Sequence, residues 1–429
     1  MNIEGGKMRF DNRYGLIFLM PFLCFTLEKN ALAAGESNPA ALGMGGAYTA
    51  LARNIDAPSW NPANLGLSDQ SNFSIGIINM GIGIKNNSFT IADYNRYNGK
   101  TLTDEDKEDI LNSIPEGGLE FNMSGEAAAL NFSAGNLAVT YKAYGISGGA
   151  MDKDPIRLFF YGNAVVRDVS VTDSRGIAFA VGDFAISYGK AVSNWRGGEL
   201  TVGGSLHYLQ GLAYEKVMEA VGGVITTDSG FIGSGVLRLN TSSGGSGYAL
   251  DLGTALRFKE NWYFSASWHN IASNLNWSSG NEEILYSYQM QPITAEIIAN
   301  GNQDSLVSTS DTTYSIDDFS SDLPGIFKLG IARKLSQLTW AFDIEQNFSD
   351  IPGYGVNPRF STGVEYSPIA ILPIRTGMAL GGGQGSLYAI GFGIHVGAFN
   401  FDFGMAGIGS PIPSSSKGVK YACGMGLHF

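Results

Sequence analysis

Large apolar residues alternate with small or polar ones in segment after segment of this chain, from residue 71 onward. In 338–345 every second residue is large and apolar, and the residues between them include Asp343 and Glu345. The same alternation runs through 399–406. Successive side chains of a β-strand point to opposite faces, so each such strand has one apolar face and one that takes charge. Strands that face lipid on one side and a lumen on the other show this pattern over about ten positions.

Fourteen segments of this kind are predicted to be strands. Short connections, such as 134–136 and 259–261, alternate with longer ones, such as 85–119 and 273–325, as turns and outer loops do in bacterial barrels. A two-sheet sandwich gives no reason for this sorting. We therefore predict an all-β fold, a transmembrane antiparallel β-barrel of about 14 strands. The predicted strands are 71–84, 120–133, 137–146, 175–191, 199–213, 247–258, 262–272, 326–334, 338–347, 358–367, 373–381, 386–395, 398–406 and 418–429.

The first 33 residues are predicted to be a signal peptide. Basic residues, an apolar run at 14–27 and small residues at 31–33 follow one another in the order of a secretory leader. The apolar run is too short to cross a bilayer. No run of about eighteen apolar residues follows it, so the sequence offers no transmembrane helix. If the protein lies in a membrane, it must therefore cross it as a closed barrel.

Residues 41–66 read neither as an alternating strand nor as a polar loop. Glycines let the backbone bend and pack closely, and a proline fixes a turn through its restricted φ and missing N–H. Such a segment needs an enclosure, which a barrel provides. We expect an N-terminal plug (hatch) inside the lumen, with domains at 1–33 (signal peptide), 34–70 (plug) and 71–429 (barrel); the alternative is that 61–63 is only a tight turn. The plug motif comprises Gly43, Gly45, Gly46, Trp60, Asn61, Pro62 and Ala63.

The sequence LGMGGAYTALA at 42–52, followed by WNPA at 60–63, resembles the hatch of the FadL-like family of outer-membrane transporters for long-chain fatty acids and other hydrophobic compounds. It is also similar to PorV-type relatives. The resemblance implies a passive channel for fatty acids or aromatic hydrocarbons in the bacterial outer membrane, without enzymatic activity. A PorV-like docking or shuttle protein for protein secretion and a structural barrel without transport remain alternatives. The family's lateral opening comes from a kinked strand, and the break in alternation near Gly125 and Glu126 is a candidate kink, although not in the third strand.

Charged residues of both signs lie on the face of the predicted strands that is expected to point inward. Adjacent strands offer pairs, Lys328 with Asp343 or Glu345, and Glu365 with Arg375. We expect these charges to neutralise one another and hold the plug, rather than to form a selective binding ring. The inward charges are Lys142, Asp251, Arg257, Lys328, Asp343, Glu345, Arg359, Glu365, Arg375 and Asp402.

The last predicted strand places Tyr421, Cys423, Met425, Leu427 and Phe429 on one face. An edge strand with such a face would aggregate in water. The segment resembles the C-terminal assembly signal of outer-membrane barrels, carried here by Tyr421, Leu427 and Phe429. The resemblance implies the barrel assembly machinery as a partner.

Enzymatic and metal chemistry finds little support in the sequence. The four histidines fall in four different predicted strands without the spacing of zinc ligands. Residues 145–149 match the pattern G-x-S-x-G, but they end a strand rather than join a strand to a helix. A net charge of −12 argues against nucleic acid. We expect no catalytic residue, metal or cofactor, and a monomer whose partners are outer-membrane lipid and a hydrophobic ligand.

Two long connections carry further expectations. Thr103 precedes three acidic residues, which predicts a capped short helix. The connection 273–325 is rich in Ser, Asn, Asp and Thr, and is predicted to be a mobile outer loop.

Overall fold

The computed structural model describes residues 37–162, 165–172, 174–195, 197–228, 230–259, 261–294, 306–348 and 355–429. The predicted signal peptide lies outside these ranges. Within them, no helix is both long enough and apolar enough to cross a bilayer.

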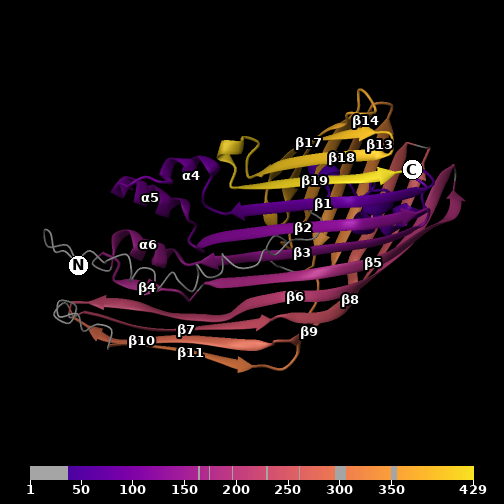
Figure 1. Cartoon of the computed structure of the whole chain (residues 1–429). Coiled ribbons are helices and arrows are strands. Elements are labelled where there is room, and N and C mark those ends of the chain that lie inside the picture. Colours follow the sequence, from indigo (N-terminus) through magenta and orange to yellow (C-terminus); the bar gives the residue numbers. More distant parts are fainter. Residues whose placement is uncertain are drawn as a thin grey trace.

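Antiparallel strands form a closed barrel of fourteen strands in the described part of the chain (Figure 1). Its seam joins β1 (Phe73–Asn86) to β19 (Gly418–His428). Every predicted strand has its counterpart, so the all-β barrel is confirmed. In order around the wall, the others are β2 (Leu119–Ala134), β3 (Leu137–Met151), β5 (Arg175–Trp195), β6 (Gly198–Thr227), β8 (Gly244–Phe258), β9 (Trp262–Ser279), β13 (Ile326–Leu335), β14 (Leu338–Asn347), β15 (Arg359–Tyr366), β16 (Ile374–Gly381), β17 (Leu387–Val396) and β18 (Phe399–Ile408).

The predicted alternation corresponds to the two faces of this wall. In β14, the Trp340 side chain is exposed on the outside, whereas Ala341 is completely buried. In β17, Ile390, Phe392 and Ile394 are likewise exposed. Because each strand pairs with a neighbour on both sides, backbone polar groups along the paired lengths are satisfied within the wall, which is what a strand needs in order to cross a bilayer.

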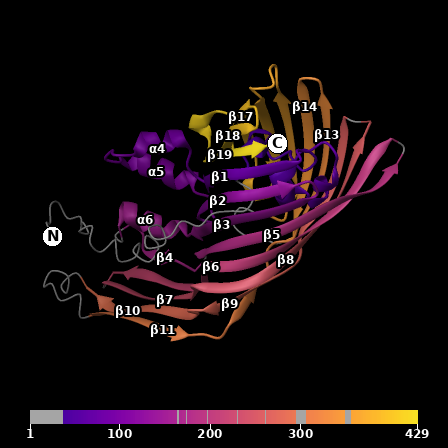
Figure 2. The same ribbon diagram turned by 45° about the vertical axis from the view of Figure 1, so that its right-hand side comes forward.

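Further strands extend the sheet beyond the barrel, and they correct the predicted loop at 273–325. The distal half of β6 pairs with β7 (Gly230–Ser242), β7 with β10 (Glu282–Ile293), and β10 with β11 (Val307–Ser315). Figures 1 and 2 show these strands projecting to the left of the barrel. A strand outside the bilayer needs no apolar row, and β11 has the sequence VSTSDTTYS, so composition alone suggested a loop. Two short strands complete this region: β4 (Asp168–Ser170), paired with β6, and β12 (Phe319–Ser321), paired with β9.

Three helices lie at the same end as these extensions (Figure 1). The predicted helix is α5 (Asp104–Ser113), and Thr103 and Asp106 form its capping box. The preceding α4 (Ile91–Tyr97) has the same box and was not predicted. The third is α6 (Lys153–Tyr161).

The predicted irregularity in β2 lies further along the strand than expected. Glu126 keeps regular pairing with Tyr144, and the register shifts only between Ala128 and Phe132. Leu130 has a φ of 53°, which is uncommon for a residue with a side chain. The sequence break at 125–126 therefore did not mark the bulge itself.

Candidate functional site

An N-terminal segment (residues 37–70) lies against the inner surface of the barrel. Its short helices are α2 (Pro39–Gly43), η2 (Asn54–Asp56), α3 (Ala57–Trp60) and η3 (Pro62–Gly66). These helices contact strands around the wall: α2 lies against β16–β19, η2 against β1–β3, and η3 against β5, β6 and β8. In Figure 1 the indigo ribbon of the segment lies among the strands at the end where the C-terminus is found.

The glycines predicted from the motif allow backbone to pack on backbone. Gly45 and Gly46 have φ values of +67° and +89°, which a side chain would strain. The wall contributes matching glycines. A Cβ on Gly377 would lie 2.2 Å from the carbonyl carbon of Met44, and one on Gly203 would lie 2.7 Å from Ala63. Small residues on both surfaces therefore bring the segment into direct contact with β6 and β16.

Asn61 joins the segment to the wall. Its Nδ2 donates to the carbonyl oxygen of Thr254 at 2.9 Å, and its Oδ1 accepts the N–H of Ala63 at 3.0 Å. The residue is completely buried. Pro62 then starts η3, because its missing N–H needs no partner in a first turn.

Asn64 performs a similar role that the sequence analysis did not assign. Its Nδ2 donates to the carbonyl oxygens of Thr49 and Ala52 at 2.9 and 3.0 Å, and its Oδ1 accepts from Ser265 at 3.2 Å. The sequence feature that could have indicated this role is the second Asn of the sequence NPAN.

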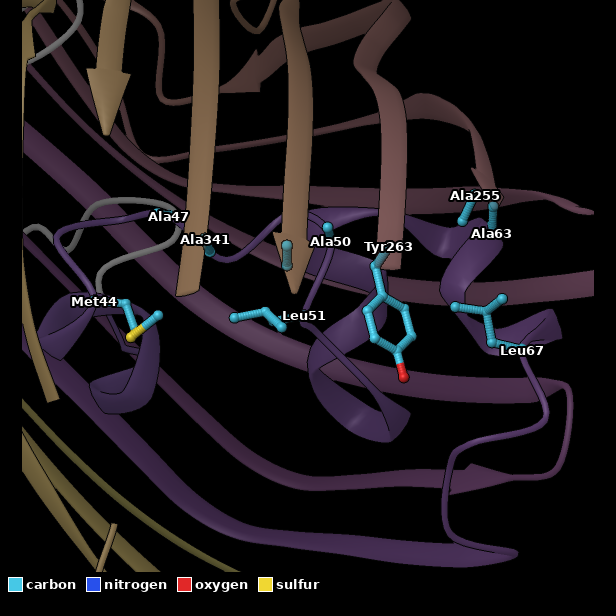
Figure 3. Close-up of a cluster of buried hydrophobic side chains, with 10 residues drawn as sticks. Met44, Ala47, Ala50, Leu51, Ala63, Leu67, Ala255, Tyr263 and Ala341 are labelled. Atoms are coloured by element: carbon cyan, nitrogen blue, oxygen red, sulfur yellow. The ribbon is translucent and has the colours of Figure 1, made fainter. Parts of the chain in front are cut away.

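Apolar contacts fill the rest of this interface. Leu51 and Leu67 of the segment lie on either side of Tyr263 of β9 in Figure 3. Alanines of β8, β13 and β14 complete the surface, which keeps water out of the contact. The cluster comprises Met44, Ala47, Ala50, Leu51, Ala63, Leu67, Ala255, Tyr263, Ala332 and Ala341.

Several of the predicted inward charges meet the segment directly. Arg257 donates to Ser68 Oγ at 2.7 Å, and Lys142 Nζ lies 3.5 Å from Ser59 Oγ. Asp343 accepts the N–H groups of Tyr48 and Thr49 at 2.9 and 2.8 Å. Arg359 donates to the carbonyl oxygen of Gly45 at 3.2 Å. Lys328 lies 4.3 Å from the centre of the Trp60 ring.

Lys328 is paired with Glu345, at 3.5 Å, rather than with Asp343. The Asp343 carboxylate is instead occupied by backbone N–H groups of the N-terminal segment. Of the two partners expected for Lys328, the structure therefore selects Glu345.

A second charged group lies on β15–β18. Arg375 bridges Glu365 at 2.7 Å and Asp402 at 2.5 Å, and His395 lies 3.2 Å from Asp402. The expected pair Glu365–Arg375 is thus present. Arg257 lies apart from this group, 3.1 Å from Glu199.

Asp56 of the N-terminal segment lies within the electrostatic reach of this second group. Burial raises the pKa of Asp56 to about 7, and Asp402 adds to the shift. The side chain of Asn38 and the guanidinium of Arg375 oppose it. The segment therefore carries a carboxyl group that titrates near neutral pH.

A chain of hydrogen bonds across β5, β6, β8 and β9 was not predicted. Asp183 and Asp251 lie on either side of His207, at 2.8 and 3.2 Å, and Asp251 also contacts His269 at 2.7 Å. Lys142 lies 3.9 Å from Asp183. The histidines lie far apart in sequence, and only the stagger of the strands brings them together. The described residues contain no cluster of three or more side chains suited to a metal ion.

A cavity of about 150 Å³ is lined both by this group and by the N-terminal segment. Trp60 and Ser59 line it from the segment, and Lys142, His269 and Arg359 line it from the wall. Charged side chains share this lining with apolar ones such as Leu42, Trp60 and Ile326, so the cavity is mixed in character.

Further along the same strands lies an aromatic cluster. Trp277 is completely buried, and its ring centre lies 5.1 Å from that of Tyr214 and 6.4 Å from that of Phe319. Trp277 is eight positions beyond His269 in β9, and is thus farther from Trp262, where this strand starts. Tyr144 belongs to this cluster and also lines the cavity.

The residues of the predicted assembly signal lie on β19 and at the chain end. Phe429 exchanges backbone hydrogen bonds with Phe73, at 2.8 and 3.3 Å, and their rings stack at 6.3 Å. Tyr421 and Phe429 are exposed on the outside, and Leu427 is partly exposed. The end of β19 is therefore accessible at the barrel seam.

Solved structures with the same fold include transporters and channels. The chain is similar to the Ralstonia pickettii toluene transporter TbuX, with 15% identity, a TM-score of 0.51, and coverage of 94% of this chain and 100% of that chain. For the CymD monoaromatic hydrocarbon channel the values are 13%, 0.50, 93% and 99%, and for a deltaS2 mutant of the TodX monoaromatic hydrocarbon channel they are 11%, 0.54, 92% and 99%. The FadL-like resemblance is confirmed at the level of the fold.

Sequence comparison gives the family itself. No curated protein matches the chain. A profile of a family of unknown function, DUF5723, matches residues 62–406. Because this match covers most of the chain, the protein belongs to the DUF5723 family of unknown function.

Proposed function

We propose that the protein is a bacterial outer-membrane channel for the passive uptake of hydrophobic small molecules. The observation that carries the proposal is the packing of residues 37–70 against strands all around the wall. Proteins with the same fold are named as a toluene transporter and as a monoaromatic hydrocarbon channel. These names favour transport over the secretion-docking alternative.

Residues 37–70 are the plug of this channel. Glycine-to-backbone contacts leave little space between the segment and β6 or β16, so a solute cannot pass without some movement of the segment. The segment is held by apolar contacts and by hydrogen bonds, each of which contributes about 0.5–1.5 kcal/mol net. A local shift is therefore far less costly than unfolding of the wall, which depends on strand pairing.

The aromatic cluster around Trp277 is the surface that we expect a hydrophobic solute to meet. Trp277 itself is completely buried, so its partly exposed neighbours Tyr214 and Phe319 supply the contact. Their rings offer large apolar faces to a flat apolar molecule. The cavity at the N-terminal segment carries charged side chains, which suit an uncharged hydrocarbon less well. We therefore expect the solute to be retained at the aromatic cluster rather than in this cavity.

Uptake of N-phenyl-1-naphthylamine by intact cells tests the proposal, because an intact outer leaflet excludes this dye. Cells that express the protein should take up the dye several-fold faster than cells with an empty vector. Deletion of residues 37–70 should increase the rate further, with heat-modifiable migration as the control for a folded barrel. Equal uptake in all three strains would contradict the channel function.

A further inference from the structure

His207 of β6 and His269 of β9 each contact hydrogen-bond acceptors through both ring nitrogens. His207 Nδ1 lies 2.8 Å from Asp183, and its Nε2 lies 3.2 Å from Asp251. An ionised carboxylate only accepts hydrogen bonds, so each contact requires a proton on the ring nitrogen. The geometry therefore fits His207 as an imidazolium between two carboxylates.

His269 shows the same arrangement and reaches the N-terminal segment. Its Nδ1 lies 2.7 Å from Asp251, and its Nε2 lies 2.9 Å from the carbonyl oxygen of Trp60. A carbonyl oxygen cannot donate a hydrogen bond. A neutral ring has only one N–H, so one of these contacts would then set a lone pair against an oxygen.

Asp251 also accepts a hydrogen bond from β9 at a point where the pairing of this strand with its neighbours is interrupted. Its Oδ1 accepts the N–H of Asn270 at 2.8 Å, and Asn270 has a φ of 52°. On one side of β9, pairing with β13 stops at His269 and pairing with β12 starts only at Leu275. On the other side, pairing with β8 shifts register at the same place. Side chains thus replace backbone ladder bonds at this point of the wall.

We propose that Asp251, His207 and His269 form a proton-dependent latch that fastens the N-terminal segment to this interruption in β9. The latch is closed while both rings are protonated. Loss of a proton from His269 removes either its bond to Trp60 or its bond to Asp251. The Ser267 hydroxyl, which donates to the same carbonyl oxygen of Trp60 at 2.8 Å, then remains as the wall's donor there, and the segment loosens. The inference rests on the proposed function, in which this segment is the plug.

Other charged groups surround the latch. They share its cavity from β3, β5, β13, β14, β15 and β19, and in the segment itself Asp56 titrates separately. Opposite charges favour the protonated rings and like charges oppose them, so the pH of release reflects the whole group. The charged residues lining the cavity with the two histidines are Lys142, Asp183, Asp251, Lys328, Glu345, Arg359 and Lys420.

Reactivity of a cysteine introduced at position 59 tests the latch without depending on transport. Ser59 lines the cavity from the segment, so Ser59→Cys reports its exposure in a full-length protein whose two native cysteines are replaced by alanine. Asp56→Asn is included to remove the second titrating group. Labelling by a water-soluble maleimide is normalised to Ser415→Cys, an exposed position, which corrects for thiol ionisation. The normalised rate should rise about tenfold between an acidic and an alkaline buffer.

Variants at His269 distinguish the effect of its titrating proton from the effect of its hydrogen bond to Trp60. His269→Gln can donate an amide N–H to Trp60 but does not titrate, so labelling should stay slow at both pH values. His269→Ala should label rapidly at both. His428→Gln, in which the lost ring is bonded to Ser74 of β1, should follow the unsubstituted protein and serves as the matched control.

Two results would overturn the latch: a normalised rate that does not change with pH, or a pH dependence that persists in His269→Gln. Dye uptake measured in parallel distinguishes this failure from that of the channel function. A pH-dependent labelling rate at position 59 without dye uptake would keep the latch and contradict transport.

Discussion

The side-chain amide of Asn61 donates to the carbonyl oxygen of Thr254 in β8 at a distance of 2.9 Å. Gly253, next to that carbonyl, has no room for a side chain, because a Cβ there would lie 2.0 Å from the Asn61 oxygen. The plug motif and a glycine in the wall are therefore parts of one contact.

Asn61→Ala should loosen the N-terminal segment without unfolding the barrel. Loss of a buried hydrogen-bonding side chain costs about 1–3 kcal/mol, and here the cost falls on the contact with Thr254. Labelling of Ser59→Cys should become at least several-fold faster, while heat-modifiable migration is retained. Asn98→Ala, at an exposed position after α4, is the matched control. Equal labelling of both variants would show that Asn61 does not hold the segment.

Gly377→Ala should displace the segment from the other side. The added Cβ would lie 2.2 Å from the carbonyl carbon of Met44, and neither backbone can move freely. Strain in packed sites typically costs about 1–3 kcal/mol. Thermal unfolding in detergent and labelling at position 59 measure the effect. Gly117→Ala, where a Cβ meets nothing within 4 Å, should behave like the unsubstituted protein; a neutral Gly377→Ala would contradict the close packing.

Packing of the segment should also weaken as the pH rises through the range in which Asp56 ionises. Burial raises the pKa of Asp56 to about 7, from an ordinary value of 3.8. The packed state therefore holds its proton longer than the released state. Packing is tightest below about pH 4 and loses this contribution progressively up to about pH 7.

Asp56→Asn tests this sign. The variant cannot ionise at this position, so the change in normalised labelling at position 59 between about pH 4 and about pH 7 should be smaller than in the unsubstituted protein. Asp109→Asn, in the exposed part of α5, is the control. If the Asp56→Asn variant keeps the full change in labelling with pH, groups other than Asp56 cause that change.

The sequence predicted the parts of this fold in which one residue points out of the barrel and the next points inward. That pattern is strong in β14 and absent from β11, which explains why the wall was found and the extension was missed. The glycines and Asn61 were predicted because tight backbone packing restricts residue type. The meeting of His207 with His269 depends on barrel stagger, which single strands do not encode.

Replacement of Phe429 by Asp should block assembly in cells rather than folding in detergent. The backbone of Phe429 pairs with Phe73 at the seam, and that pairing does not depend on the side chain. The ring is exposed, so its loss removes a recognition surface with little change in packing. Outer-membrane levels should fall at least several-fold, while protein refolded in detergent keeps its heat-modifiable migration. Ile412→Asp, at an exposed loop position, should reach the membrane normally; normal membrane levels of Phe429→Asp would contradict the assembly signal.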